Sequence, residues 1–165
     1  MARIAGDPRS LDPHVQPGAG ELIYISNLYS FVFFNAKGEE LECDLCTDWG
    51  LEDGGKTVWF DIVKNATYSD GTPVRAKDIA YSIKKITGAI DGVVSPRCGI
   101  LKEYLATDKD AFTVVDDNHV KIHLKAPSAA FPWWLGVNYC GIVADGADRE
   151  VLIKKNNGSG PFTIK

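Results

Sequence analysis

The sequence lacks the features that mark several large classes of protein. None of its 165 residues lie in an apolar run long enough to span a membrane, and the longest such run surrounds residues 31–34. Its 18 basic residues form no block and are outnumbered by 22 acidic ones, so nothing indicates nucleic-acid binding. Internal repeats and low-complexity tracts are absent, and residues 1–8 have no apolar stretch typical of a signal peptide.

The composition that remains is that of an ordinary globular chain. Hydrophobic residues make up 45% of the sequence and charged residues 24%, which excludes an intrinsically disordered or fibrous protein. A chain of this length can bury a core without covalent staples. The four cysteines are too few for a disulfide scaffold and leave the redox compartment open. Taken alone, the length predicts one small domain.

Two segments have a clear hydrophobic period. Residues 57–63 alternate apolar and polar side chains and predict a strand. Residues 76–87 carry one apolar stripe and predict a helix that ends at Gly88. The stripe consists of Ile79, Ile83 and Ile86, and Lys77, Lys84 and Lys85 are expected to lie outside this apolar stripe.

The other segments complete a mixed α/β (α+β) pattern. Residues 21–35 have the residue types of a strand but the spacing of a helix, and both readings stay open. Residues 112–115 and 120–124 flank a turn and predict a hairpin. We also expect short helices over residues 100–105, after a Ser128 cap, and over residues 150–155, and a short strand over residues 139–143.

Cys43 and Cys46 form a CxxC pattern, which in some proteins is a redox or metal pair. A redox pair needs a lowered thiol pKa, but the neighbouring carboxylates of Glu42, Asp44 and Asp48 would raise it. A zinc site needs a second pair of ligands, and Cys98 and Cys140 lack paired spacing. We therefore interpret the pattern as structurally incidental. A local disulfide and a metal or thiol-redox site are the alternatives.

No group of residues predicts catalysis, a cofactor or a metal. His119 and His123 fall on one face of an expected strand but about 13 Å apart, too far to share an ion, and are interpreted as solvated. His14 lies in a proline-flanked loop with no visible partner. The four tryptophans are interpreted as core residues: Trp49, Trp59, Trp133 and Trp134.

An ordered set of motifs is more informative than any single one. The sequence resembles the family 5 extracellular solute-binding proteins, which serve ABC importers of oligopeptides, dipeptides, nickel and some oligosaccharides. The segments that carry the resemblance are residues 7–14 (DPRSLDPH), 41–49, 59–62, 68–82 (YSDGTPVRAKDIAYS), 120–127 and 158–162 (GSGPF). Arg75 departs from the family pattern by replacing a helix-capping threonine, and Cys43 and Cys46 replace a proline and an alanine.

The resemblance implies a periplasmic-binding-protein-like type II fold and changes the meaning of the length. Members of this family have several hundred residues and three domains, with the ligand between domains I and III. Residues 1–36 would then begin domain I, residues 37–155 would form domain II, and residues 156–165 would return to domain I. The 165 residues are therefore expected to be an N-terminal fragment.

The resemblance also implies ligand-binding residues. Gln16, Pro17, Gly18 and Ala19 match a strip whose backbone contacts peptide ligands, and Arg97 lies in a loop that reaches the ligand in several members. The guanidinium of Arg97 suits a carboxylate because it can donate two parallel hydrogen bonds. The alternatives are a simple turn at residues 17–19 and a solvated loop residue at Arg97.

The function implied is the substrate-binding component of an ABC importer, without catalysis. The intact protein would bind a peptide or similar small solute, dock on a membrane permease, and reside in the periplasm or outside the cell, with a lipoprotein anchor as one arrangement. The fragment alone is expected to bind no solute usefully and to self-associate through an exposed edge and apolar patch. The rival is a thiol-redox or metal-binding domain that uses Cys43 and Cys46.

Overall fold

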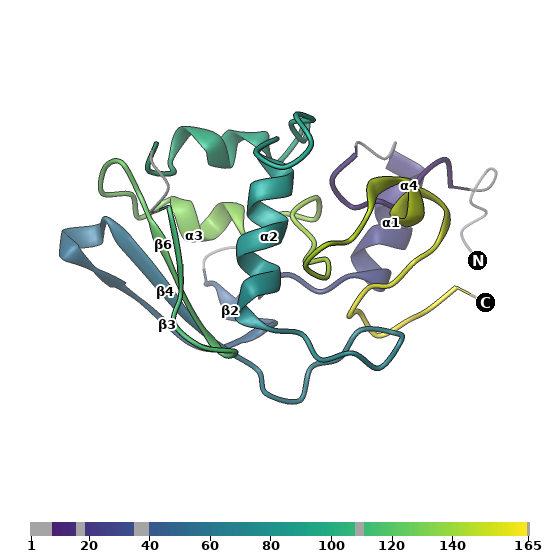
Figure 1. Ribbon diagram of the computed structural model, residues 1–165, viewed down its shortest axis with the longest axis horizontal. Helices are drawn as coiled ribbons and strands as arrows, with labels where there is room; N and C mark the ends of the chain where they lie inside the picture. Colours follow the sequence, from purple (N-terminus) through teal and green to yellow (C-terminus); the bar gives the residue numbers. More distant parts are fainter. Residues whose placement is uncertain (1–7, 16–18, 35–39, 108–110, 165) are drawn as a thin grey trace.

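A four-stranded antiparallel sheet in the order β3-β4-β6-β5 forms the centre of the larger part of the molecule (Figure 1). The computed structural model describes residues 8–15, 19–34, 40–107 and 111–164. The strands of this sheet are β3 (Cys46–Glu52), β4 (Thr57–Ile62), β5 (Phe112–Val114) and β6 (His119–His123). A two-residue pair, β1 (Phe33–Phe34) and β2 (Glu42–Cys43), precedes them.

The helices complete a mixed α/β architecture. They are α1 (Ala19–Leu28), α2 (Ala76–Ile86), α3 (Phe131–Trp134) and α4 (Arg149–Lys154), with 3₁₀ turns η1 (Asp53–Gly55) and η2 (Gly99–Glu103). The predicted mixed fold class is therefore confirmed, together with the strand at residues 57–63, the helix at residues 76–87 and the hairpin.

One face of the sheet carries the main core. The alternation along β4 buries Val58, Phe60 and Ile62, and the register sets Phe60 opposite Val120 of β6. Helix α2 covers this face with its isoleucine stripe, which is fully buried in the same cluster. Each fully buried side chain of this size contributes roughly 1.5–3 kcal/mol relative to an exposed one, so this layer dominates the stability.

Helix α2 confirms the expected ends but corrects one of its lysines. Arg75 makes no side-chain cap, but Asp78 supplies the other half of a capping box, because its Oδ2 accepts the N–H of Arg75 at 2.8 Å. Gly88 follows the helix with φ +77°, a conformation that favours glycine. Lys85, expected off the apolar stripe, is only 2% exposed, and its ammonium meets buried carboxylates instead of water.

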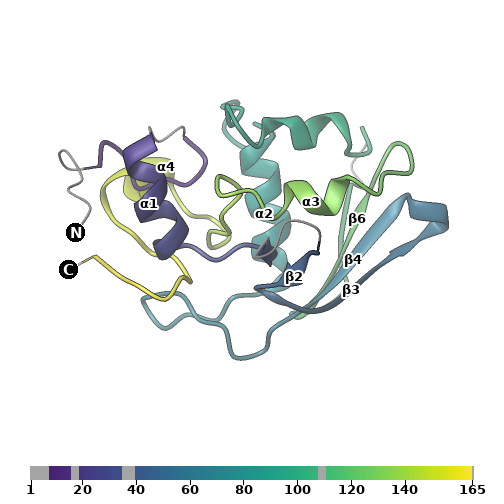
Figure 2. The same ribbon diagram turned by 180° about the vertical axis from the view of Figure 1, so that it is seen from behind.

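The ambiguous segment 21–35 resolves into both readings in turn. Helix α1 takes its first part and the short strand β1 its end. Helices α1 and α4 and the segment that follows α4 lie together at the side away from the sheet (Figures 1 and 2). A second, smaller cluster holds this end together: Leu11, Ile25, Leu28, Tyr29, Val143 and Leu152.

The segment after α4 runs against the last turn of α1. Gly160 N–H donates to the carbonyl of Leu28 at 3.0 Å, and Phe162 N–H donates to that of Asn27 at 3.2 Å. A Cβ at Gly160 would lie 2.6 Å from the Asn27 oxygen, and one at Gly158 would collide with the Leu28 oxygen. The glycines of the GSGPF motif are therefore required by close backbone packing.

Three local predictions are wrong, and a fourth is met by a shorter element. Helix α3 starts at Phe131 after Ala130, with no side-chain cap, so Ser128 does not cap it. Residues 139–143 start in a turn at Tyr139, continue without regular secondary structure and pair with no strand of the described chain, and Ile142 N–H instead donates to the carbonyl of Ser30. The predicted helix at residues 100–105 is the shorter 3₁₀ turn η2. Trp133 is 37% exposed and is not a core residue.

Candidate functional site

The N-terminal SLDPH motif folds into a turn that fixes the chain just before the predicted ligand strip. Asp12 Oδ1 accepts the N–H of His14 at 2.9 Å, and Asp12 N–H donates to Ser10 Oγ at 3.1 Å. His14 Nε2–H donates to the carbonyl of Gly141 at 2.7 Å. His14 is thus buried and partnered, and the view of a histidine without a partner is corrected.

A charge cluster, made of the buried Asp12 and Lys85 and the more exposed Asp91 and Arg149, anchors this turn. Asp12 Oδ2 lies 3.8 Å from Lys85 Nζ and 3.4 Å from Arg149 Nη1. Asp91 Oδ2 lies 3.3 Å from Lys85 Nζ and accepts two hydrogen bonds from Arg149, at 2.9 and 2.8 Å. Two cations face two anions, so the cluster balances its charge while joining three segments, at residue 12, residues 85–91 and residue 149.

Two groups at this cluster, its neighbour His14 and its member Asp91, have shifted pKa values. Burial lowers the pKa of His14 from 6.5 to about 4, outweighing the opposite influence of Asp12, and the cations Lys85 and Arg149 lower it further. Burial alone would raise the pKa of Asp91, but the Arg149 hydrogen bonds and charge bring it down to about 2. His14 is therefore neutral and Asp91 ionised at neutral pH.

The predicted ligand strip is described only at its end. Gln16, Pro17 and Gly18 lie outside the described residues, and Ala19 is the first residue of α1. The charge cluster holds the chain that precedes the strip, and α1 is formed by the chain that follows it. No contact in the described part of the chain brings Arg97 to Ala19.

Arg97 is exposed and rests on an aromatic ring. Its guanidinium carbon lies 4.9 Å from the centroid of the Tyr139 ring, within cation–π range. The residues that follow each of them, Cys98 and Cys140, form a disulfide with a Cα–Cα distance of 5.8 Å. Sequence reasoning missed Tyr139, although its place beside one of four cysteines was a usable signal.

The cysteines are all paired, which corrects their interpretation as incidental. Cys43 and Cys46 form a disulfide across Asp44 and Leu45, and Cys98 and Cys140 form the second. Asp44 Oδ2 accepts the N–H of Phe31 at 2.8 Å beside a cavity of about 350 Å³, and burial raises the pKa of its carboxyl. The alternative of a local disulfide holds for this pair, and the redox or metal reading has no support.

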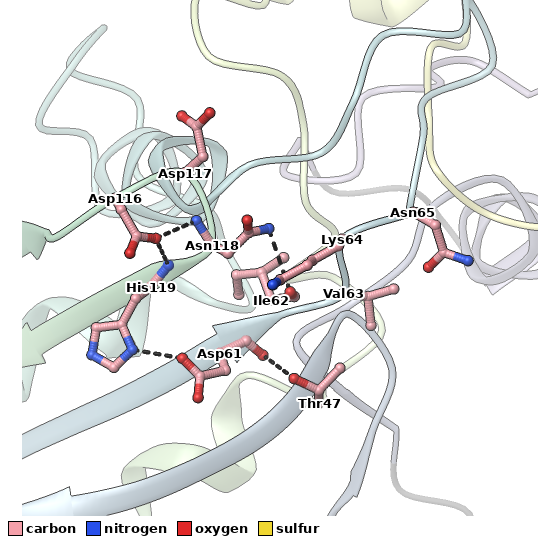
Figure 3. A pocket seen from close by; sticks show the side chains of 10 residues that line it. All are labelled: Thr47, Asp61, Ile62, Val63, Lys64, Asn65, Asp116, Asp117, Asn118 and His119. Atoms are coloured by element: carbon pink, nitrogen blue, oxygen red, sulfur yellow. Dashed lines mark hydrogen bonds and ion pairs between the residues drawn. The ribbon is translucent and has the colours of Figure 1, made fainter.

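A cavity of about 920 Å³ opens at the end of β4 and the β5–β6 turn (Figure 3). His119 Nδ1 lies 2.6 Å from Asp61 Oδ1, and Asp116 Oδ1 accepts the backbone N–H groups of Asn118 and His119. His123, in turn, contacts the hydroxyls of Thr57 and Thr113. Both histidines are half-buried and hydrogen-bonded, which corrects their reading as solvated.

This cavity offers acidic and amide groups but no nucleophile paired with a base. None of the predicted ligand residues lines it. Within the described residues, no three histidine, cysteine or carboxylate side chains are placed to hold a metal ion. Nor does any helix there have the length and apolarity needed to cross a membrane.

Comparison with known proteins identifies the family. The model of "Bacterial extracellular solute-binding proteins, family 5 Middle" matches residues 40–165, well over half of the chain. The chain belongs to this family. Two Escherichia coli relatives agree with this family 5 assignment. The probable D,D-dipeptide-binding periplasmic protein DdpA is 29% identical over 98% of this chain, and the periplasmic murein peptide-binding protein MppA is 30% identical over all of it.

Solved structures of family 5-like proteins have the same fold. The E. coli murein tripeptide binding protein MppA superposes with a TM-score of 0.79 at 25% identity, covering 96% of this chain. Helicobacter pylori DppA in complex with the peptide STSA gives 0.76 at 22% identity over 95% of it. The expected type II periplasmic-binding-protein fold is confirmed. The chain spans about a third of these proteins, 32% of DdpA and 34% of the MppA structure.

Proposed function

We propose that this family 5 chain is part of the substrate-binding component of an ABC importer for peptides or similar small solutes. The family match over residues 40–165 carries the proposal. DdpA is named as a probable D,D-dipeptide-binding protein and MppA as a murein peptide-binding protein, and these names favour a short peptide as solute. The protein would act by binding and delivery to a permease, without catalysis.

The domain plan of the family gives the chain its place in the intact protein. Residues 1–36 begin domain I, residues 37–155 form domain II, and residues 156–165 return to domain I. The hydrogen bonds from Gly160 and Phe162 to the end of α1 support the joining of the two outer segments in one unit. The sheet and α2 supply a core drawn mainly from the middle segment, which Val32 and Phe33 of the first segment join.

The ligand would meet two parts of the chain. The backbone of Gln16, Pro17, Gly18 and Ala19 would hydrogen-bond an extended peptide, as an added strand does. Arg97 would bind a carboxylate, because its guanidinium has no carboxylate partner in the described part of the chain and is exposed. The remaining two thirds of the relatives' length would complete the site.

An extracytoplasmic location follows from the same proposal. Two disulfides are stable in an oxidising compartment and rare in the cytosol. The relatives DdpA and MppA are periplasmic by name. We therefore infer that the protein works in the periplasm or at the cell surface, where a lipid anchor would hold it near its permease.

Peptide binding by the intact protein tests the function. The DNA that follows codon 165 should continue in frame for several hundred codons, and calorimetry on that product should show micromolar or tighter binding of short peptides. Replacing Arg97 by alanine should weaken the binding of peptides with a free carboxylate by tenfold or more, roughly the worth of a charge-assisted hydrogen bond. Lys102→Ala, an exposed change in η2, is the matched control. Failure of every di- to pentapeptide to bind would refute the proposal.

A further inference from the structure

Two neighbouring pairs of residues join the same two segments of chain. Cys98 and Cys140 are bonded covalently, and the residues just before them, Arg97 and Tyr139, are in cation–π contact at 4.9 Å. Cys98 is fully buried and Cys140 is 2% exposed, so the disulfide belongs to the core. Arg97 is exposed, and the covalent link therefore lies directly beneath a surface cation.

Backbone and side-chain contacts fix both segments around the disulfide. Ser95 N–H donates to the carbonyl of Ile86 at the end of α2, at 2.8 Å. Ser95 Oγ then accepts the N–H of Cys98 at 3.3 Å, and its carbonyl accepts that of Gly99 at 2.9 Å. The backbone of Arg97 is thus held from both sides, within a tight turn.

The opposite segment supplies a rigid aromatic surface. Tyr139 is 8% exposed and packs in the main core, and Cys140 N–H donates to the carbonyl of Val137 at 2.8 Å. A guanidinium that lies over such a ring can still donate hydrogen bonds to a planar anion through its N–H groups. An arginine with a free side chain would first have to lose its rotamer freedom before binding one.

We propose that the Cys98–Cys140 disulfide and the Tyr139 ring position Arg97 for carboxylate binding, so that this binding depends on the oxidised state of the disulfide. Tyr139 is a positioning residue, and the ligand class is a free carboxylate such as a peptide C-terminus. The carboxylate part rests on the function proposed above. The positioning part does not, because it concerns the side chain without ligand.

The position of Arg97 can be read by NMR on the 165-residue chain. The Hδ and Hε resonances of Arg97 should be shifted upfield by the ring current of Tyr139. Tyr139→Phe should keep the shift because the ring remains, whereas Tyr139→Leu should remove it. Replacing Cys98 and Cys140 by serine should remove at least half of it, and the same change at the other disulfide should leave it intact as the matched control.

The carboxylate role is read on the same resonances with a probe. An N-acetylated dipeptide with a free C-terminus should move the Arg97 Hε signal in the millimolar range, and its C-terminal amide should not. Tyr139→Leu and the Cys98/Cys140 double variant should each weaken this response at least fivefold, and Tyr139→Phe less than twofold. If the Cys98/Cys140 double variant does not fold, the comparison of Tyr139→Leu with Tyr139→Phe decides whether the ring positions Arg97.

The outcomes separate the two proposals. An unshifted Arg97 in the oxidised chain, or equal shifts in the leucine and phenylalanine variants, would overturn the positioning. A positioned Arg97 that responds alike to the acid and the amide would overturn the carboxylate role while leaving the family function intact. Peptide binding by the intact protein that does not change in Arg97→Ala would also count against this role alone.

Discussion

Acidification from pH 7 to pH 5 is expected to destabilise the protein by about 2 kcal/mol through His14 alone. The folded chain holds the His14 pKa at about 4, whereas the unfolded chain has the ordinary value of 6.5. Between these values the unfolded state binds more protons, so stability rises with pH there. The contribution of the neutral imidazole is complete above pH 6.5, and it falls steadily until it levels off near pH 4.

The magnitude follows from the linkage relation. A folded pKa of about 4 and an unfolded pKa of 6.5 give a loss of about 2 kcal/mol between pH 7 and pH 5. The structure explains why the proton is excluded: His14 is 2% exposed, its Nδ1 has no hydrogen-bond partner among the described residues, and two cations lie in the same cluster. Asp91 has a pKa of about 2 in the folded chain, so its own contribution to the free energy of unfolding is lost only below pH 4.

Urea unfolding followed by tryptophan fluorescence measures the effect. His14→Gln removes the titrating group, and its amide can still donate to the Gly141 carbonyl that His14 contacts. The free energy of unfolding should fall more steeply with acidification in the wild type than in this variant, by about 2 kcal/mol over the same range. Parallel curves for the two proteins would refute the reasoning, because every other titrating group is common to both.

Three further perturbations test the fold. Lys85→Met should cost about 3–5 kcal/mol in urea unfolding, because it leaves one cation, Arg149, to balance Asp91 and the fully buried Asp12, whereas exposed Lys77→Met should change stability by less than about 1 kcal/mol; equal effects would contradict the charge cluster. Removal of the Cys98–Cys140 disulfide should lower the free energy of unfolding by about 4 kcal/mol, and removal of the Cys43–Cys46 disulfide by about 2 kcal/mol. The first disulfide closes the longer loop, with a separation of 42 residues against 3, and the reverse order of effects would contradict this entropic account. Ile23→Ser should weaken self-association of the chain in sedimentation runs, because Ile23 (51% exposed), Phe162 and Ile164 line one apolar groove of about 300 Å³; a wild-type monomer at high concentration would exclude it.

The elements that the sequence predicted well are those whose signal is local. The alternation of residues 57–63 and the stripe of residues 76–87 match β4 and α2, because one packed face determines each pattern. Residues 139–143 have the composition of a strand, but their backbone pairs with Ser30 rather than with a sheet. Apolar composition predicts that a segment is buried, and the partner that decides its secondary structure lies elsewhere in the chain.

The errors at Lys85 and the cysteines have the same cause. A helical wheel assigns lysine to solvent, and only the fold brings Asp12, more than 70 residues earlier, beside the Lys85 ammonium. Cys98 and Cys140 have no motif spacing, and their pairing is a consequence of how α2 and the segment after α3 meet. Such contacts join residues that are far apart in sequence, so no window along the chain contains both partners.

The same distinction between local signals and long-range contacts applies to the candidate site. Resemblance to family 5 was enough to single out residues 16–19 and Arg97, but it gave no physical reason for their positions. The structure supplies one for each: the charge cluster holds the turn that precedes the strip, and the second disulfide and Tyr139 hold Arg97. At Arg97 a buried long-range link, the Cys98–Cys140 disulfide, lies directly beside the exposed side chain that we propose to bind the ligand. A surface that must bind without reorganising needs such support from the core, and this is why the perturbations with most effect on Arg97 are expected at Tyr139 and Cys140, some 40 residues away.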